Sequence, residues 1–78
     1  MPDPNFELQQ LAMADRHIER GEKIVADQEL ELMHLRLKDY DIELAERTLA
    51  VLEDSLQTMY RHRNMIVRTI QQIDRGLI

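Results

Sequence analysis

Apolar and small side chains recur at alternating intervals of three and four residues along most of the chain. This alternation has a period of 3.5 residues, which is typical of helices that pack through heptad a and d positions. The core positions of a first run are Leu11, Ala14, Ile18, Gly21, Val25, Gln28, Leu32 and Leu35. Those of a second run are Ile42, Ala45, Leu49, Leu52, Leu56, Met59, Arg63, Ile66, Ile70, Ile73 and Leu77. The pattern therefore predicts two long α-helices that pack through these core positions.

The two runs are out of phase where they meet. Continuing the first run would place Asp39 in the core, but the second run begins three residues later. Aspartate favours turns and helix N-termini, so Asp41 is expected to cap the second helix. We predict a helix over about residues 6–37, a turn over about 38–41 and a helix over about 42–75. A single unbroken helix of roughly 100 Å, with a shift in its heptads, is the alternative.

The two ends of the chain carry residues that interrupt helices. Pro2 and Pro4 are expected to keep residues 1–5 outside the first helix, as a flexible N-terminus. Gly76 is expected to end the second helix, because glycine commonly follows the last helical residue. Residues 6–78 are then expected to form a single helical-hairpin domain.

Folding the chain at the turn brings small core residues opposite large ones. If the numbers of facing residues sum to about 80, Gly21 meets Met59 and Ala14 meets Ile66, as close interdigitation requires. Two antiparallel helices then share one continuous core. The predicted fold is therefore all-α, an antiparallel two-helix coiled-coil hairpin.

A second set of apolar side chains lies at helical spacing outside the core positions. Ala26 belongs to this set in the first helix, and Thr48, Ser55 and Thr58 continue a mixed set in the second. The expected interface residues are Leu30, Met33, Leu37, Leu44 and Val51. A chain of 78 residues buries too little surface in one core. We therefore expect two hairpins to pair into a homodimeric four-helix bundle, with docking of another helical protein as the alternative.

One core position of the second run is charged, which is unusual in a hydrophobic core. In the hairpin alignment Arg63 lies opposite Ile18, and a guanidinium there must find hydrogen-bond acceptors. We expect a pair with Glu22 or Glu19 that fixes register and oligomeric state. The expected buried polar cluster consists of His17, Glu19, Glu22, His62 and Arg63. A functional anion site that adds Arg16 is the alternative.

The residues around this cluster resemble a group of small, uncharacterised alphaproteobacterial helical-hairpin (coiled-coil) proteins over residues 16–66. The matching residues in the first half are Arg16, His17, Ile18, Gly21, Glu22, Ile24 and Gln28. Those in the second half are Asp41, Ala45, Glu46, Arg47, Leu49, Leu52, Leu56, His62 and Arg63. The chain departs from the group at the turn, where Asp39, Tyr40 and Ile42 stand in place of Gly, His and Thr. The resemblance implies that His17, Gly21, Glu22, His62 and Arg63 form one constellation, and it implies no activity.

Composition and charge narrow the function classes. The formal net charge is −5, which argues against binding to nucleic acid or to an anionic membrane surface. No stretch is long and apolar enough for a membrane span, and the N-terminus lacks the apolar region of a signal peptide. The chain contains no cysteine, which excludes disulfides and thiolate chemistry. We expect a cytoplasmic protein.

Two short motifs suggest alternative functions for the chain. Glu31 and His34 match the Glu-x-x-His pair of metal-binding four-helix bundles, because residues three apart share a helix face. Residues 61–68 are locally basic and suggest a nucleic-acid-associated regulator. The chain lacks a nucleophile elbow and a phosphate-binding glycine loop, so we expect no catalytic residue and no cofactor. The function expected from the sequence is a non-enzymatic interaction protein, acting as a scaffold, adaptor or regulator.

Overall fold

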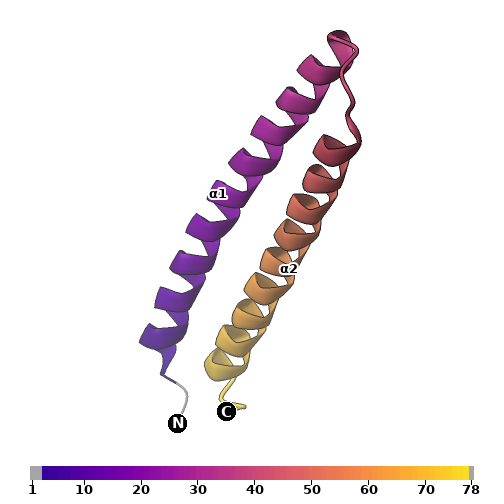
Figure 1. The fold of residues 1–78 in the computed structure, drawn as a ribbon. Helices are drawn as coiled ribbons and strands as arrows, with labels where there is room; N and C mark the ends of the chain where they lie inside the picture. The colour runs from indigo at the N-terminus through magenta and orange to yellow at the C-terminus, as the bar shows by residue number, and fades with distance from the viewer. Residues whose placement is uncertain (1–2, 78) are drawn as a thin grey trace.

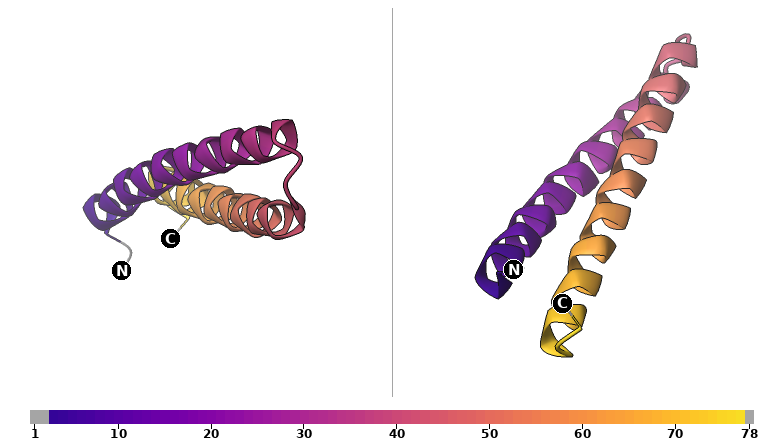
Figure 2. Two further views of the ribbon diagram at one scale, coloured as in Figure 1. Left: turned by 45° about the horizontal axis from the view of Figure 1, so that its top comes forward. Right: turned by 90° about the horizontal axis from the view of Figure 1, so that it is seen from below.

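The computed structural model shows two long antiparallel helices joined by one short turn (Figure 1). The structure describes residues 3–77, in which helix α1 spans Pro4–Leu37 and helix α2 spans Glu43–Asp74. The hairpin measures 58 × 15 × 14 Å, and the start of α1 and the end of α2 lie opposite the turn. Two further views show the helices side by side along their length (Figure 2). The prediction of an all-α helical hairpin is confirmed, and the alternative of one unbroken helix is wrong.

Helix α1 begins earlier than the sequence predicted. The Asp3 side chain accepts a hydrogen bond of 2.9 Å from the Asn5 backbone N–H, which caps the helix. Pro4 occupies the first helical position, where its missing N–H leaves no intrahelical bond unmade. The prediction of a non-helical segment over residues 1–5 is therefore wrong at Pro4 and Asn5, and residues 1–2 lie outside the described part of the chain.

The turn ends α1 with a left-handed residue. Asp39 has a φ of +58°, the Tyr40 N–H donates to the Leu35 carbonyl, and the Asp39 N–H donates to the Arg36 carbonyl. This pair of bonds is the Schellman motif, which usually places glycine at the left-handed position. The Asp41 side chain then accepts a 3.0 Å bond from the Glu43 N–H at the start of α2. Asp41 thus bonds to the first residue of α2 from one position before the N-cap residue, Ile42, which itself makes no side-chain cap bond.

Helix α2 ends with the same motif, built on glycine. Gly76 has a φ of +71°, the Leu77 N–H donates to the Gln72 carbonyl over 2.9 Å, and the Gly76 N–H donates to the Ile73 carbonyl over 3.0 Å. A left-handed residue at this position favours glycine because a side chain would crowd the following carbonyl. The prediction that Gly76 ends the second helix is confirmed.

The core follows the predicted heptad positions. The buried core residues are Ala14, Ile18, Gly21, Val25, Leu32 and Ile66. The remaining predicted core positions are half-buried, except for Leu77, which lies beyond the end of α2 and is exposed. A two-stranded coiled coil covers its a and d residues from one side only, which explains why so few are fully buried.

Gly21 lies in close contact with side chains of α2. A Cβ atom on Gly21 would lie 3.1 Å from the Met59 Sδ atom and 3.2 Å from the Leu56 Cδ1 atom. The space that a side chain would occupy is thus filled by α2. The predicted facing of Gly21 and Met59 is confirmed.

Candidate interaction surface

The hairpin exposes more surface than a globular protein of its mass. Its accessible surface is 6228 Å², whereas a folded 9.3 kDa monomer is expected to expose about 5,000 Å². Its radius of gyration is 17.6 Å, against about 11.5 Å for a compact domain of this length. Two helices alone leave most of each helix circumference in contact with solvent.

Many of the exposed side chains are apolar. Among the described residues, twelve large apolar side chains are at least 43% exposed, whereas five apolar residues are buried. The exposed set is Phe6, Leu8, Met13, Ile24, Leu30, Met33, Leu37, Tyr40, Leu44, Val51, Met65 and Leu77. Single exposed apolar residues are common on proteins, so the arrangement of this set matters more than its number.

The five predicted interface residues are all exposed, but they do not form one surface. Leu30 and Leu37 are about half a turn from the core residues Leu32 and Leu35, on the side of α1 that faces away from α2. Leu44 and Val51 instead precede core residues and lie on one flank of the hairpin, whereas Met33 follows the core residue Leu32 and lies on the other flank. A single flat partner therefore covers one of these groups and not the other.

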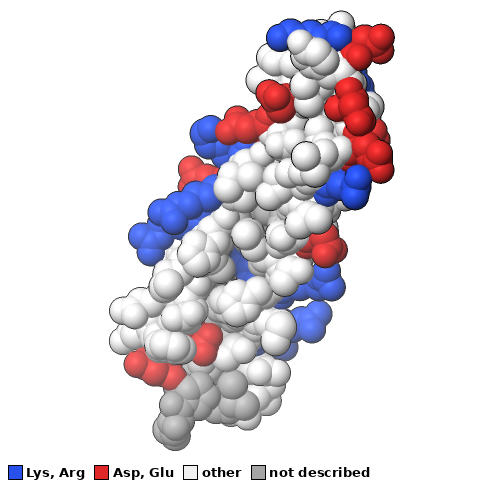
Figure 3. Space-filling model, viewed as in Figure 1, with Lys and Arg blue, Asp and Glu red and all other residues white. Residues whose placement is uncertain are grey.

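A row of nine uncharged residues runs along the whole of α2 next to the core. Each of them immediately precedes a core residue, so the row lies about 100° around the helix from the core. This uncharged row consists of Leu44, Thr48, Val51, Ser55, Thr58, His62, Met65, Thr69 and Gln72. Figure 3 shows a band without Lys, Arg, Asp or Glu that follows the hairpin between two charged edges. The sequence interpretation recognised only the half of this row nearest the turn.

Helix α1 contributes exposed apolar residues to the same flank. Phe6, Met13 and Ile24 also immediately precede positions that face α2, and each is between 43% and 52% exposed. In an antiparallel pair the preceding positions of both helices lie on the same side of the hairpin. Six of the twelve exposed apolar side chains therefore share one flank. Charged residues occur on the α1 part of this flank only at Arg20, Asp27 and Glu31.

The opposite flank of the hairpin is acidic. It is formed by residues that immediately follow a core position, and it contains eight of the 15 acidic residues of the chain. The acidic flank consists of Asp15, Glu19, Glu22, Glu29, Glu43, Glu46, Glu53 and Asp74. Packing of α1 against α2 covers the two flanks to a similar extent. The hairpin core alone therefore does not account for the lack of charge on one of them.

The three threonines of the uncharged row have their hydroxyl groups bonded within α2. Thr48 donates to the Leu44 carbonyl over 2.9 Å, Thr58 to the Asp54 carbonyl over 3.3 Å, and Thr69 to the Met65 carbonyl over 3.1 Å. A buried hydroxyl without a partner is costly, but these donors are already satisfied. The threonines thus add small, largely apolar surface to the row.

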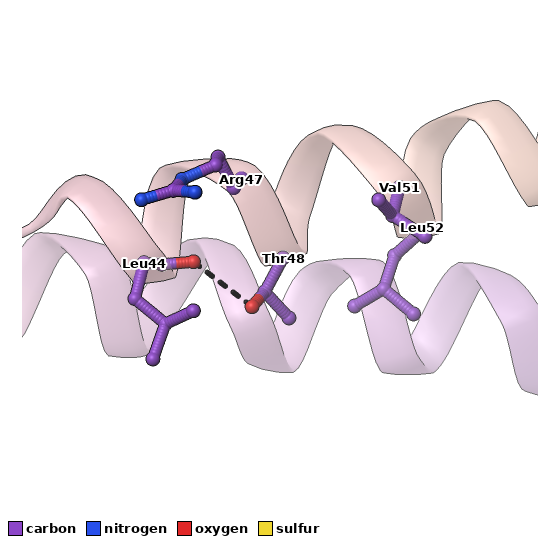
Figure 4. Close-up of a pocket in the computed structure, with 5 residues that line it drawn as sticks. All are labelled: Leu44, Arg47, Thr48, Val51 and Leu52. Carbon is purple, nitrogen blue, oxygen red and sulfur yellow. Dashed lines mark hydrogen bonds between the residues drawn. The ribbon is translucent and has the colours of Figure 1, made fainter.

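A shallow depression lies at the turn end of this row. It has a volume of about 310 Å³ and is lined by Leu44, Arg47, Thr48, Val51 and Leu52, all from α2. Figure 4 shows Leu44, Thr48 and Leu52 side by side, with the Thr48 hydroxyl bonded to the Leu44 carbonyl. Its open shape and apolar lining fit a packed side chain from another helix better than a small polar ligand.

Arg63 pairs with a different carboxylate from the one predicted. Its Nε atom donates to the Asp15 Oδ1 atom, and the two side chains are 38% and 51% exposed. Asp15 follows the core residue Ala14 and so lies on the flank beside the core. Glu19 lies further around α1 and Glu22 a full heptad nearer the turn. The predicted pairing with Glu22 or Glu19 is therefore wrong.

The predicted cluster around Arg63 is also not buried. His17, Glu19, Glu22 and His62 are exposed, and the described residues include no buried charged or polar side chain. Positions beside the core of a two-stranded coiled coil are open to solvent, so polar groups there stay hydrated. His17 and His62 precede core residues and lie on the same flank as the uncharged row, whereas the Arg63–Asp15 pair lies on the acidic flank. The structure thus divides the cluster between two surfaces.

Other ion pairs are local and exposed. Lys23 Nζ lies 2.8 Å from Asp27 Oδ2, and Arg47 lies 3.0 Å from Glu43 Oε1, each one turn apart on a single helix. The hydrogen bond from Lys23 to Asp27, aided by the opposite charge, raises the pKa of Lys23. Exposed pairs of this kind contribute little to stability.

The two alternative motifs gain no support from their placement. Glu31 and His34 are exposed, and the described residues contain no group of three or more potential metal ligands. A metal site at this pair would need ligands from a second chain. In the basic segment, Arg63 faces α1, which leaves Arg61 and Arg68 as the exposed arginines. Two arginines on an acidic protein form a weak electrostatic patch.

Comparisons with protein-family models, with curated proteins and with solved structures find no match to this chain. Neither described helix contains a segment of the length and apolar character that a bilayer crossing requires. The exposed flank of the hairpin is therefore the starting point for a functional assignment.

Proposed function

We propose that this chain is a non-enzymatic helical interaction protein that acts by pairing with a second copy of itself, as a scaffold, adaptor or regulator. The observation that carries the proposal is the contrast between the two flanks. In α2, four of the ten residues that follow a core position are acidic, whereas none of the nine that precede one is charged. A solvated flank has no physical reason to avoid charge along about 40 Å of helix.

The size of the exposed surface is consistent with a dimer. The hairpin exposes 6228 Å², which is roughly 1,200 Å² more than expected for a globular chain of this mass. A standard protein–protein interface buries about 800 Å² on each partner. Pairing of two hairpins along one flank removes an area of this order and gives a four-helix bundle.

The test is sedimentation equilibrium over a wide range of protein concentration, with helicity followed by circular dichroism on the same samples. We expect a dimer that dissociates on dilution, and a thermal midpoint that rises with protein concentration because association stabilises the folded chain. A monomer with full helicity at all concentrations would contradict self-association. The exposed flank would then have to bind a different helical protein.

A further inference from the structure

We infer that the dimer forms by antiparallel packing of α2 against α2 of the second copy, with Thr58 at the two-fold axis. This inference rests on the proposed function, because it specifies which surface of the hairpin binds the second copy. It follows from the position, chemistry and flanking charges of the uncharged row. The outer side of α1, with Leu30 and Leu37, stays exposed in this arrangement.

The uncharged row has the spacing of a second coiled-coil core. Its nine residues alternate in steps of four and three from Leu44 to Gln72, as the core positions do. They are small or apolar, apart from His62 and Gln72, and the three threonine hydroxyls are bonded to carbonyls of α2. The corresponding row of α1 is interrupted by Arg20, Asp27 and Glu31. Helix α2 is therefore the element that offers an uncharged packing surface along its whole length.

If the uncharged rows of two α2 helices overlap along their whole length, the residues that face each other are determined. In an antiparallel arrangement the ends of one row meet the opposite ends of the other, so Leu44 lies opposite Gln72 and Val51 lies opposite Met65. Thr58 is the middle residue of the row and lies opposite itself. The two most exposed apolar residues in the central part of the row, Val51 and Met65, then cover each other.

The charges at the margin of the row favour the antiparallel orientation. Arg47, Asp54, Arg61 and Arg68 lie along the edge of α2 next to the row. Parallel packing would place these edges of the two α2 helices on opposite sides of the contact, so the four residues would make no charge contacts with one another. Antiparallel packing places Asp54 beside Arg61 of the second copy, twice by symmetry. The same symmetry gives two unfavourable contacts of Arg47 with Arg68, but in each of them Arg47 is already paired with Glu43 at 3.0 Å.

The main experiment uses engineered cysteines, because the chain contains none. We expect Thr58→Cys to form an intermolecular disulfide when the dimer is treated with oxidised glutathione, since the two Cα atoms then lie within about 7 Å. Leu30→Cys is the matched control on the outer side of α1 and should stay reduced. Non-reducing gel electrophoresis at protein concentrations above and below the dimer dissociation constant gives the readout.

A second pair of variants reports the orientation. Val51→Cys alone should not cross-link, because its copy is about 20 Å away in the antiparallel dimer. A mixture of Val51→Cys with Met65→Cys should cross-link the two different chains. Cross-linking of Val51→Cys with itself would indicate parallel packing and would overturn the inference.

A charge exchange tests the same geometry without cysteine. Asp54→Arg places like charges beside Arg61 of the second copy and is expected to raise the dimer dissociation constant about tenfold. The double variant Asp54→Arg with Arg61→Asp restores opposite charges and is expected to recover affinity to within about threefold. An equally weak dimer in the double variant would count against this pairing.

The outcomes separate the inference from the proposed function. A monomer in sedimentation equilibrium contradicts both. A dimer in which Thr58→Cys stays reduced while Leu30→Cys cross-links keeps self-association and overturns the α2 interface. A dimer in which Thr58→Cys cross-links and Val51→Cys does so only with Met65→Cys establishes the arrangement.

Discussion

The two flanks of the hairpin differ in chemistry although they share one backbone geometry. Of the ten residues that follow a core position in α2, four are acidic, whereas the nine that precede one include no charge. Both flanks border the same core and meet solvent to a similar extent. Their difference shows that core formation explains the heptad positions but not the residues beside them. The uncharged flank is therefore best explained by a second packing contact, which is the self-association proposed above.

The largest expected effect on stability comes from a substitution in the core, compared with one at the neighbouring position in the uncharged row. Ile66 is 7% exposed in the core, and its neighbour Met65 is 64% exposed in the row. Ile66→Ala is expected to lower the free energy of unfolding by about 2–3 kcal/mol, because it leaves a cavity between the helices. Met65→Ala is expected to change the stability of the hairpin itself by less than about 0.5 kcal/mol while weakening the dimer. Urea unfolding over a series of protein concentrations separates the two contributions, and equal losses at the lowest concentration would contradict the assignment.

A charge placed on the uncharged flank should weaken the dimer, because it gives this flank the character of the acidic one. Val51→Glu puts two carboxylates into the proposed interface, where burial without partners is costly. We expect the dimer dissociation constant to rise at least about a hundredfold, with helicity retained. Leu30→Glu is the control on the outer side of α1, where Leu30 is 50% exposed. Similar weakening by both variants would show that the contact is not confined to the flank.

A smaller effect is expected on the acidic flank. Arg63→Leu removes an exposed pair with Asp15 and places an apolar side chain at a half-buried core position. Exposed ion pairs contribute less than about 1 kcal/mol, so we expect the free energy of unfolding to rise by about 1 kcal/mol. Arg63→Lys is the control that keeps the charge. A loss of stability in the leucine variant would show that the ion pair contributes more to stability than apolar burial does.

The smallest effect belongs to the turn, which lies at the end of both flanks. Asp39 has a φ of +58°, a conformation in which glycine avoids a steric cost. Asp39→Gly is expected to stabilise the hairpin by about 0.5–1 kcal/mol and to leave the dimer dissociation constant unchanged. Thermal unfolding of this variant, with Asp39→Ala as the destabilised control, checks the value. A change in dimer affinity would mean that the turn takes part in the contact.

The fold was predictable because its determinants are local or periodic. Core residues from Leu11 to Ile73 occupy the expected heptad positions, and Asp41 and Gly76 act at the helix ends as their chemistry indicates. The start of α1 was not predicted, because Pro4 is compatible with the first helical position when Asp3 caps the helix.

The polar contacts across the core were harder to predict. The partner of Arg63 depends on register to within about three residues, and a heptad pattern does not distinguish Asp15 from Glu19 or Glu22 at that resolution. The half of the uncharged row beyond Thr58 was missed because the polar residues His62 and Gln72 interrupt its apolar character around Met65. A search for heptad positions without charge would have found the whole row.

The single turn also determines the order in which the helices come together. The Schellman bonds and the Asp41 hydrogen bond involve residues within a few positions of each other, so they form at little cost in chain entropy. Contacts next to the turn close the shortest loops, and each further core layer then closes a slightly longer one. Such local topology is associated with fast folding. We therefore expect the hairpin to form from the turn toward its open end, where Phe6 lies, and to fray in the reverse order.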